Sequence, residues 1–323
     1  MALLTSFSVF QSWAASSWVN INNNQSIGSF FGVAATTRET VAVGIDGRIS
    51  TRNNLTGNWT VQTFAGNPDF RDVIYANGEY IAVREGGEIR TSLDGLTWNV
   101  QTSGVTTDLR SILWDGSNFL VGGQNGTILR SSNGISWQQF SSSGPFINAL
   151  AFSGSKYIAA GGYGLKISSD GISWRNVLTP PTSYSWEAAT WTGSKFYIGG
   201  LFGSGVWEST DGDTWAKSSD GNFSWNIESM VTIGGKTWMV GDNTYVFSKT
   251  KDGNWIEEYL VKNGSEYFMD VNYSGNDLIL AGFNHNVFST AIPEPSSLSL
   301  LALGGVVVAL RRLRLQAKCG FEV

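Results

Sequence analysis

Three carboxylic acids and two arginines occupy places in this sequence where they could meet and do chemistry. Asp72, Glu187 and Asp270 stand near the beginning of short apolar runs, and Arg71 and Arg110 stand at equivalent places in two such runs. Paired carboxylates about 5–9.5 Å apart catalyse glycoside hydrolysis, and arginines bind carboxylate groups. The sequence does not give the distance between the carboxylates, so the ordinary polar lining of a water-filled space is the alternative interpretation.

The beginnings of two further apolar runs, and two long connecting segments, contain side chains suited to binding a sugar. Asn148 and Trp186 begin further apolar runs, and the segments 178–186 and 218–225 contain Ser and aromatic residues. Exposed aromatic rings beside polar groups suit stacking on sugar rings. The expected ligand-binding set is Arg71, Asp72, Arg110, Asn148, Trp186, Glu187 and Asp270, and no catalytic residue is assigned.

The cysteine and histidine counts restrict metal and nucleophile chemistry. The sequence contains one cysteine, Cys319, and one histidine, His285. A Cys-based zinc site, a multi-histidine metal site, an internal disulfide and a Ser/His/Asp triad with any other histidine are therefore excluded. His285 stands in an Asn-rich break between apolar runs, which favours a turn residue over a catalyst. No metal and no cofactor are predicted.

A tryptophan that returns every 37 to 41 residues indicates how these groups are positioned. The series is Trp18, Trp59, Trp98, Trp137, Trp174, Trp215 and Trp255. A fixed period of this size is typical of a repeat architecture. In the unit 109–140, four short apolar runs are separated by breaks rich in Gly, Asn and Asp, which predicts four antiparallel strands.

Four-stranded units repeated in series are typical of a β-propeller, and seven second-strand runs predict seven blades. The last unit, 268–290, has three runs, while the segment around Trp18 is a fourth-strand run without the other three. We therefore expect an all-β propeller over residues 16–291, closed by the N-terminal strand that completes the last blade. The candidate residues above are expected at the mouth of the central channel, on the face with the turns between second and third strands.

Five of the tryptophans end a sequence motif of the form Ser-x-Asp-Gly-x-Thr-Trp or a close copy of it. This motif resembles the Asp-box of the sialidase-like (bacterial neuraminidase repeat) propellers, shortened by one residue between Asp and Trp. Asp or Asn in a tight turn accepts backbone hydrogen bonds, so a structural role is expected rather than calcium binding. The resemblance implies that these turns lie on the outer rim. The expected turn residues are Asp94 and Trp98, Asn133 and Trp137, Asp170 and Trp174, Asp211 and Trp215, and Asp252 and Trp255. The first copy, 50–59, is longer and has no Asp.

This resemblance implies what an enzyme of the sialidase-like kind would need. Such hydrolases use an arginine cluster for the substrate carboxylate, a Tyr/Glu nucleophile pair and an acid. Arg71, Arg110 and Glu187 are expected to converge on the channel, but no third arginine and no suitably placed tyrosine accompany them. A non-enzymatic role is therefore favoured, with Asp72, Glu187 and Asp270 kept as candidate carboxylates for hydrolysis.

The last thirty residues have a different character from the repeats. A Pro293-Glu294-Pro295 motif is followed by an apolar run, 298–310, and then by Arg311 and Arg312. This arrangement resembles the PEP-CTERM sorting signal of Gram-negative bacteria, which implies recognition and removal by an exosortase-type enzyme. Thirteen apolar residues reach roughly 20 Å as a helix, so 298–310 is expected to be a short transmembrane helix, with the arginines on the cytoplasmic side. An ordinary single-span anchor is the alternative.

The N-terminus is interpreted as an export signal. Residues 1–10 are mostly apolar and are followed by small residues at Ala14 and Ala15, although a positively charged start is missing. The expected organisation is a signal peptide over 1–15, the propeller over 16–291, the sorting signal over 292–314 and a tail over 315–323.

Charge and organisation together define the expected function. A net charge of −5 gives no electrostatic support for nucleic acid binding. We expect an exported monomer at the cell envelope or outside the cell, anchored in the inner membrane before processing, that binds extracellular polysaccharide or a surface protein without catalysis. A carbohydrate-active enzyme with its site in the channel, and a purely structural matrix component, are the alternatives.

Overall fold

The described part of the chain consists of strands and short turns. The computed structural model describes residues 18–22, 25–66, 68–177, 184–242, 245–258, 267–275, 277–284 and 286–291. The expected signal peptide, the sorting motif with its apolar run, and His285 all lie outside these residues. No helix in the ranges above is long and apolar enough to cross a membrane.

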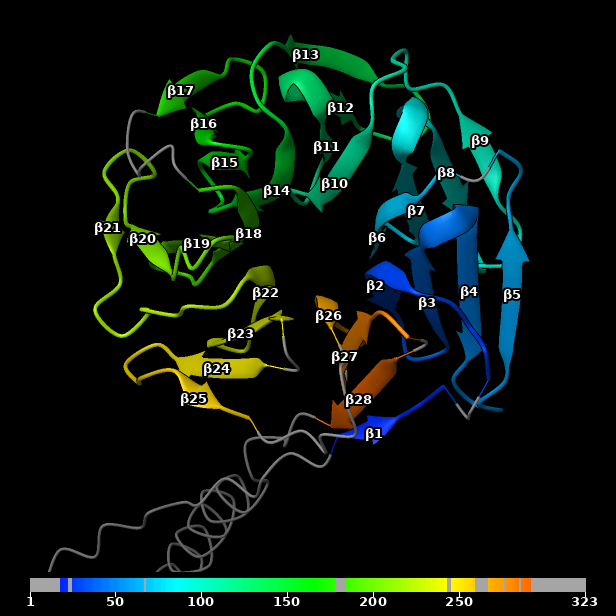
Figure 1. The fold of residues 1–323 in the computed structure, drawn as a ribbon. Helices are drawn as coiled ribbons and strands as arrows, with labels where there is room; N and C mark the ends of the chain where they lie inside the picture. The colour runs from blue at the N-terminus through cyan, green and yellow to red at the C-terminus, as the bar shows by residue number, and fades with distance from the viewer. Residues whose placement is uncertain are drawn as a thin grey trace, which may run out of the picture. The chain divides into compact units, whose positions relative to one another are not determined.

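Seven four-stranded antiparallel sheets, arranged radially, make up the described residues, and the prediction of a seven-bladed propeller is confirmed (Figure 1). Each blade runs from an innermost first strand to an outermost fourth strand. Blade 1 contains β2 (Phe30–Ala35), β3 (Glu39–Gly44), β4 (Arg48–Asn53) and β5 (Trp59–Thr63). Blade 2 contains β6 (Phe70–Ala76), β7 (Glu79–Arg84), β8 (Ile89–Ser92) and β9 (Asn99–Gln101). Blade 3 contains β10 (Leu109–Trp114), β11 (Phe119–Gly123), β12 (Thr127–Ser131) and β13 (Gln138–Ser142).

The remaining blades follow the same order. Blade 4 contains β14 (Ile147–Phe152), β15 (Tyr157–Gly161), β16 (Gly164–Ser168) and β17 (Arg175–Val177). Blade 5 contains β18 (Trp186–Trp191), β19 (Phe196–Gly200), β20 (Trp207–Ser209) and β21 (Ala216–Lys217). Blade 6 contains β22 (Ile227–Ile233), β23 (Lys236–Gly241), β24 (Val246–Thr250) and β25 (Ile256–Glu257). Blade 7 contains β26 (Phe268–Tyr273), β27 (Asp277–Gly282), β28 (Val287–Ala291) and, from the N-terminal end of the described chain, β1 (Val19–Asn20).

The hydrophobic core lies between neighbouring blades, because both faces of each second strand are covered. Every residue of β11, β15 and β19 is buried. Such strands read as continuous apolar runs rather than alternating ones. One cluster joins Ile158 and Ile167 of blade 4 to Phe196 and Ile198 of blade 5. The fourth strands are mostly exposed, which leaves the outer rim to the turns.

The N-terminal segment contacts both blade 7 and blade 1. Val19 pairs with Ser289 of β28, and the Trp59 indole of β5 donates a hydrogen bond of 2.9 Å to the Ile21 carbonyl. Ile21 and Ile27 are buried in a cluster that contains residues of both blades. This segment therefore supplies the fourth strand of one blade and core side chains for the next.

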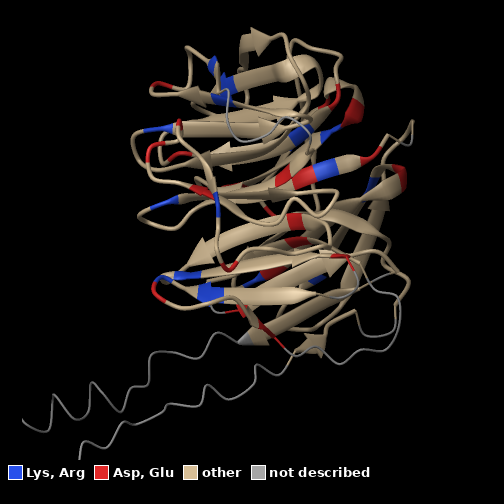
Figure 2. Ribbon diagram, turned by 60° about the vertical axis from the view of Figure 1, so that its left-hand side comes forward, with Lys and Arg blue, Asp and Glu red and all other residues tan. Residues whose placement is uncertain are grey.

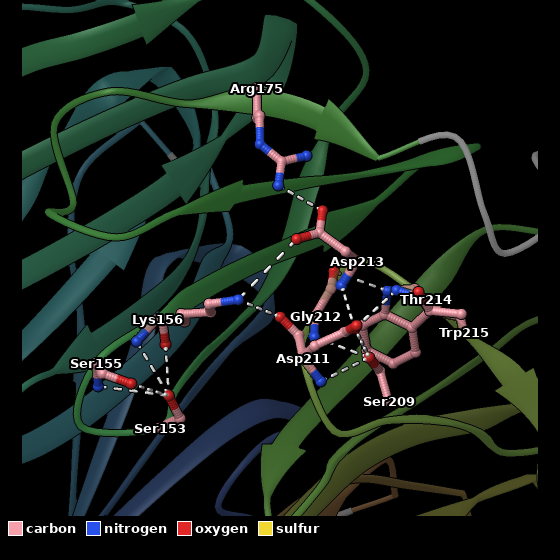
Figure 3. Close-up of polar contacts among 10 residues, drawn as sticks. All are labelled: Ser153, Ser155, Lys156, Arg175, Ser209, Asp211, Gly212, Asp213, Thr214 and Trp215. Carbon is pink, nitrogen blue, oxygen red and sulfur yellow. Dashed lines mark hydrogen bonds and ion pairs between the residues drawn. The ribbon is translucent and has the colours of Figure 1, made fainter.

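The turns that precede the repeated tryptophans contact the preceding blade. In blade 5, the Asp211 carboxylate accepts the N–H groups of Asp213 and Thr214, at 2.8 Å each, and the Ser209 hydroxyl. Figure 3 shows how Lys156 of blade 4 donates to the Asp211 carbonyl, while Arg175 forms an ion pair with Asp213.

These turns do not all have the same contacts. Asn53 of blade 1 accepts the N–H groups of Leu55 and Thr56, both at 3.0 Å, so an Asn replaces the Asp that the longer first copy lacks. Within the described part of the chain, the Asp252 side chain makes no hydrogen bond, and the Trp174 and Trp255 indole N–H groups are buried without acceptors.

Candidate functional site

A β-bulge recurs near the start of the first strand of every blade. In β6, Phe70 pairs with Arg84 and Asp72 pairs with Val83, which leaves Arg71 between them without a partner. The same register shift occurs in the six other first strands. The bulged residues are Phe31, Arg71, Arg110, Asn148, Glu187, Glu228 and Met269. A bulge redirects a side chain, and bulges are frequent next to functional sites.

All seven bulged residues line one cavity of about 410 Å³ in the central channel. This volume is in the range of small-molecule sites. We call the seven residues the bulge ring. The bulge ring lies at the end of the channel where the first strands begin. Because first and second strands are antiparallel, the turns that follow the second strands lie at the same end. Two arginines and four carboxylic acids line the cavity, so its lining is rich in acid.

The two arginines of the bulge ring differ in their partners. Arg71 forms ion pairs with Glu85 and, at 3.3 Å, with Asp69, and its guanidinium lies 4.2 Å from the centre of the Phe31 ring. Arg110 has no carboxylate within ion-pair distance in the described residues. Its guanidinium lies over Phe146, 4.6 Å from the ring centre, and its Nε is buried without an acceptor. Arg110 therefore lines the cavity with a charge that no carboxylate of the described residues pairs.

Asn148 and Glu187 connect the arginine side of the bulge ring to its acidic side. The Asn148 amide accepts from Arg110 at 3.5 Å and donates to the Glu187 carboxylate at 3.0 Å. The Ser185 hydroxyl donates to the same carboxylate at 2.6 Å. Burial raises the pKa of Glu187, although the Ser185 hydroxyl, the Arg110 charge and the Asn148 amide oppose that shift.

Glu228 follows Glu187 in the bulge ring and completes a polar arc of Arg110, Asn148, Glu187 and Glu228. It was not in the expected ligand-binding set. Its carboxyl group lines the cavity but makes no hydrogen bond or ion pair with the described residues. Burial, together with the nearby charges of Glu187 and Asp242, raises its pKa to about 8. The equivalence of Glu228 with Glu187 at the start of a first strand was the signal in the sequence that could have identified it.

Asp72 and Asp270 line the cavity one residue beyond the bulge, and both hold neighbouring blades together. Asp72 accepts the N–H group of Ile112 in blade 3 at 2.9 Å. Asp270 accepts the N–H group of Val33 in blade 1 at 2.9 Å and the Ser229 hydroxyl of blade 6 at 2.7 Å. Burial raises the pKa of both carboxyls, and the charge of Asp270 adds to the shift of Asp72.

Trp186 does not belong to this site, which corrects its assignment to the channel mouth. Its side chain is fully buried in the core between blades 4 and 5. Trp186 precedes the bulge and so points into the blade, as Phe70 does in blade 2. Of the two expected aromatic segments, 178–183 lies outside the described residues. In the other, the half-buried Trp225 stacks on Phe247 and Tyr245.

The other six expected residues, Arg71, Asp72, Arg110, Asn148, Glu187 and Asp270, all line the same cavity. In the part of the chain that the structure describes, no group of three or more His, Cys, Asp or Glu side chains is arranged to hold a metal ion. Figure 2 shows basic and acidic residues spread over the blades, and neither sign gathers on one side in that view.

Comparisons with known proteins address the fold and the C-terminus. The solved structure of YCF48 bound to D1 peptide has a TM-score of 0.68 at 15% identity, over 88% of this chain and 96% of that chain. YCF48 from Cyanidioschyzon merolae has a TM-score of 0.66 at 14% identity, over 86% and 99%. A catalytically inactive virginiamycin B lyase from Staphylococcus aureus with quinupristin has a TM-score of 0.71 at 11% identity, over 85% and 99%. These identities support a shared fold alone.

No curated protein matches the chain. Residues 291–314 match the PEP-CTERM protein-sorting motif, which agrees with the prediction from Pro293, Glu294 and Pro295. The motif implies export and a processing step at a C-terminal membrane anchor. The chain is therefore an exported protein with a seven-bladed β-propeller and a C-terminal PEP-CTERM sorting motif.

Proposed function

We propose that the protein binds a surface polysaccharide at the bulge-ring end of its channel, as a non-catalytic binding or scaffold protein of the cell envelope. The observation that carries this proposal is the polar arc from Arg110 through Asn148 and Glu187 to Glu228 in a cavity of about 410 Å³. Such an arc offers both donors and acceptors to hydroxyl groups. Its residues come from four neighbouring blades, so a rigid scaffold fixes their spacing.

Binding is favoured over hydrolysis because most of the candidate carboxylates are already engaged. Asp72 and Asp270 accept backbone N–H groups from adjacent blades. Arg71 is paired with Glu85 and Asp69, so it has less charge to offer an anionic substrate. Engaged groups of this kind position a site and stabilise a fold rather than exchange protons with a substrate.

A carbohydrate-active enzyme is the second candidate, and the pair of Glu187 and Glu228 favours it. The two carboxyls occupy equivalent bulges in neighbouring blades, and their charges interact. With a pKa of about 8, Glu228 would be protonated at neutral pH and would donate a proton to a glycosidic oxygen. Glu187, held by Ser185 and Asn148, would then accept a proton from the attacking water.

A glycan array probed with the whole chain in detergent tests the binding proposal. We expect retention on at least one polysaccharide class and no release of reducing ends from it. Loss of binding in Arg110→Ala would support the site, and retention on no glycan would refute the proposal. Release of reducing ends that is abolished in both Glu187→Gln and Glu228→Gln would establish the enzyme instead.

We also propose that an exosortase-type enzyme removes the tail after export, with residues 298–310 as the transient membrane anchor. The matched motif at 291–314 supports this sequence of events. Mass analysis of the surface-released protein tests it. A product that ends before Arg311 is expected, whereas a released protein that keeps Arg311 and Arg312 would contradict it.

Two structural roles belong to the same proposal. The pairing of β1 with β28 supports closure of the ring by the N-terminal strand, as does the contact between Trp59 and Ile21. Four of the five Asp and Asn turns support the interpretation as shortened Asp-boxes with a structural role, since Asp94, Asn133, Asp170 and Asp211 accept backbone N–H groups of their own turns. Both roles stabilise the ring of blades that carries the channel.

A further inference from the structure

The turn between the second and third strands contains a residue of positive φ in every blade where that position is described. Five of the six are not glycine, although only Gly, Asn and Asp adopt this left-handed conformation readily. The positions, in blades 1, 2, 3, 4, 5 and 7, are Asp46 (φ 58°), Gly86 (74°), Asn125 (57°), Tyr163 (64°), Phe202 (61°) and Asn284 (60°). Blades 4 and 5 thus carry aromatic residues where their neighbours carry Asp, Gly or Asn.

The aromatic residues at 163 and 202 are unfavourable for folding. A left-handed conformation costs an ordinary L-residue roughly 1–2 kcal/mol, and a bulky residue there is a genuine outlier. Asn125, at the equivalent position after the second strand of blade 3, is a residue suited to this conformation. Backbone strain of this kind persists mainly where the side chain serves a function.

Packing in the propeller does not compensate for this strain. Tyr163 is 58% exposed and Phe202 is 66% exposed. Among the described residues, neither ring contacts another aromatic ring or a cation. Their rings therefore contribute exposed apolar surface on the face of the bulge ring.

The two turns are fixed to the segment that leads into Glu187. The Tyr163 N–H group donates to the Tyr184 carbonyl at 3.2 Å, and the N–H group of Leu201, next to Phe202, donates to the Ser185 carbonyl at 2.9 Å. The Ser185 hydroxyl in turn donates to Glu187. The aromatic residues therefore flank the strand start that carries the centre of the polar arc.

We infer that Tyr163 and Phe202 form an aromatic platform that stacks on sugar rings of a saccharide extending from the channel cavity over blades 4 and 5. This inference rests on the proposed function and names the part of the ligand that lies outside the cavity. A sugar ring has an apolar face for an aromatic ring and hydroxyl groups for the adjacent polar arc. Two separate rings among polar neighbours such as Ser185 and Asn226 fit this occupant better than a partner that needs a continuous apolar patch.

The double variant Tyr163→Asn and Phe202→Asn separates folding from binding. It removes two strained residues, so a rise of a few degrees in Tm is expected for the whole chain in detergent. Affinity for the longest oligosaccharide retained by the wild type should fall at least tenfold, by calorimetry. The control Asn125→Tyr places the same strain in blade 3 and should lower Tm, and Tyr163→Trp should keep the affinity.

The outcomes distinguish this inference from the function on which it rests. If the wild type binds no saccharide, the proposed function fails. If it binds and the double variant binds equally well, the function stands and the platform is refuted.

Discussion

Arg71 and Arg110 illustrate, at the scale of single residues, how two identical side chains at equivalent positions acquire different roles. Arg110 lacks a carboxylate partner in the described residues, whereas Arg71 is paired twice. We predict that Arg110→Ala weakens saccharide binding by about tenfold to a hundredfold, because a charge-assisted hydrogen bond is lost, while Tm changes little. Calorimetric titration and thermal unfolding measure the two effects.

The matched variant, Arg71→Ala, should show the opposite balance. It leaves Glu85 and Asp69 without their cation, so we expect a loss of about 1 kcal/mol in unfolding free energy and a smaller effect on affinity. Equal losses of affinity in the two variants would contradict the distinction between a ligand-binding and a structural arginine.

Glu228 gives the protein a specific pH dependence. Its pKa is raised from 4.5 to about 8, so the folded state binds its proton more tightly than the unfolded state does. Its contribution to stability is therefore present at low pH and is lost as pH rises from about 5 to 8. We predict that the unfolding free energy of Glu228→Gln exceeds that of the wild type by on the order of 2 kcal/mol at pH 8, so the variant unfolds at a higher temperature there, with little difference at pH 5.

Thermal unfolding of the two proteins from pH 5 to pH 9 checks this prediction. Glu187→Gln serves as the comparison, because four groups, Ser185, Arg110, Asn148 and Arg71, already stabilise its charge, and it should show a weaker pH dependence. A constant difference between wild type and Glu228→Gln at all pH values would contradict the raised pKa.

The sequence predicted most of the bulge ring and missed the rule that creates it. Period and composition placed Arg71, Arg110 and Glu187 at the starts of inner strands, where the structure finds them. Strand alternation alone does not show which residue faces the channel, because a bulge shifts the alternation by one. Trp186 was therefore assigned to the channel although it precedes the bulge. Glu228 stands at the start of an inner strand, as Glu187 does, but was left out of the expected ligand-binding set although it occupies a bulge.

At the scale of elements, the rim turns have similar sequences but different hydrogen bonds, so we expect them to contribute unequally to stability. Asp211 accepts two N–H groups and the Ser209 hydroxyl, and the N–H groups of Thr214 and Asp213 lower its pKa to about 2. We predict that Asp211→Ala lowers the unfolding free energy by about 1–2 kcal/mol, because backbone donors lose their acceptor. The charge contributes stability at pH values above about 4, and this contribution is lost as pH falls toward 2.

Asp252→Ala is the matched control for this turn. Its side chain makes no hydrogen bond with the described residues, so a change within about 0.5 kcal/mol is expected. Denaturant unfolding at pH 7 measures both variants. Similar losses of unfolding free energy at the two positions would contradict this account, because stability would then not depend on the hydrogen bonds that the motif's Asp makes.

The turns between second and third strands contain a pattern in the sequence that indicates a left-handed backbone position. Gly, Asn and Asp at the other blades identify a position that needs positive φ, and Tyr163 and Phe202 violate that requirement. Exposed aromatic residues were expected, but in the long connecting segments, since length is visible in a sequence and a left-handed backbone is not. The requirement for glycine at position 200 is likewise not visible in the sequence. It arises because a Cβ there would lie 1.9 Å from the Ser185 carbonyl oxygen.

For the whole molecule, the N-terminal strand is expected to determine whether the ring stays closed. Ile27 is fully buried in a cluster with residues of blades 1 and 7. We predict that Ile27→Ala costs about 2–4 kcal/mol in unfolding free energy, and that replacing residues 18–22 with a Gly/Ser segment causes a similar or larger loss. Limited proteolysis, followed by identification of the cut sites, should then show cleavage first in blades 7 and 1. Cleavage spread evenly over the blades would contradict closure by this strand.

The crystal structure of the whole chain with its best-binding oligosaccharide tests the central claim most directly. The account predicts one sugar in the channel cavity, hydrogen-bonded to Arg110 and Glu187, and the next sugars stacked on Tyr163 and Phe202. An oligosaccharide bound at the outer rim, beside the turns of Asp94 or Asp211 and away from the bulge ring, would contradict it.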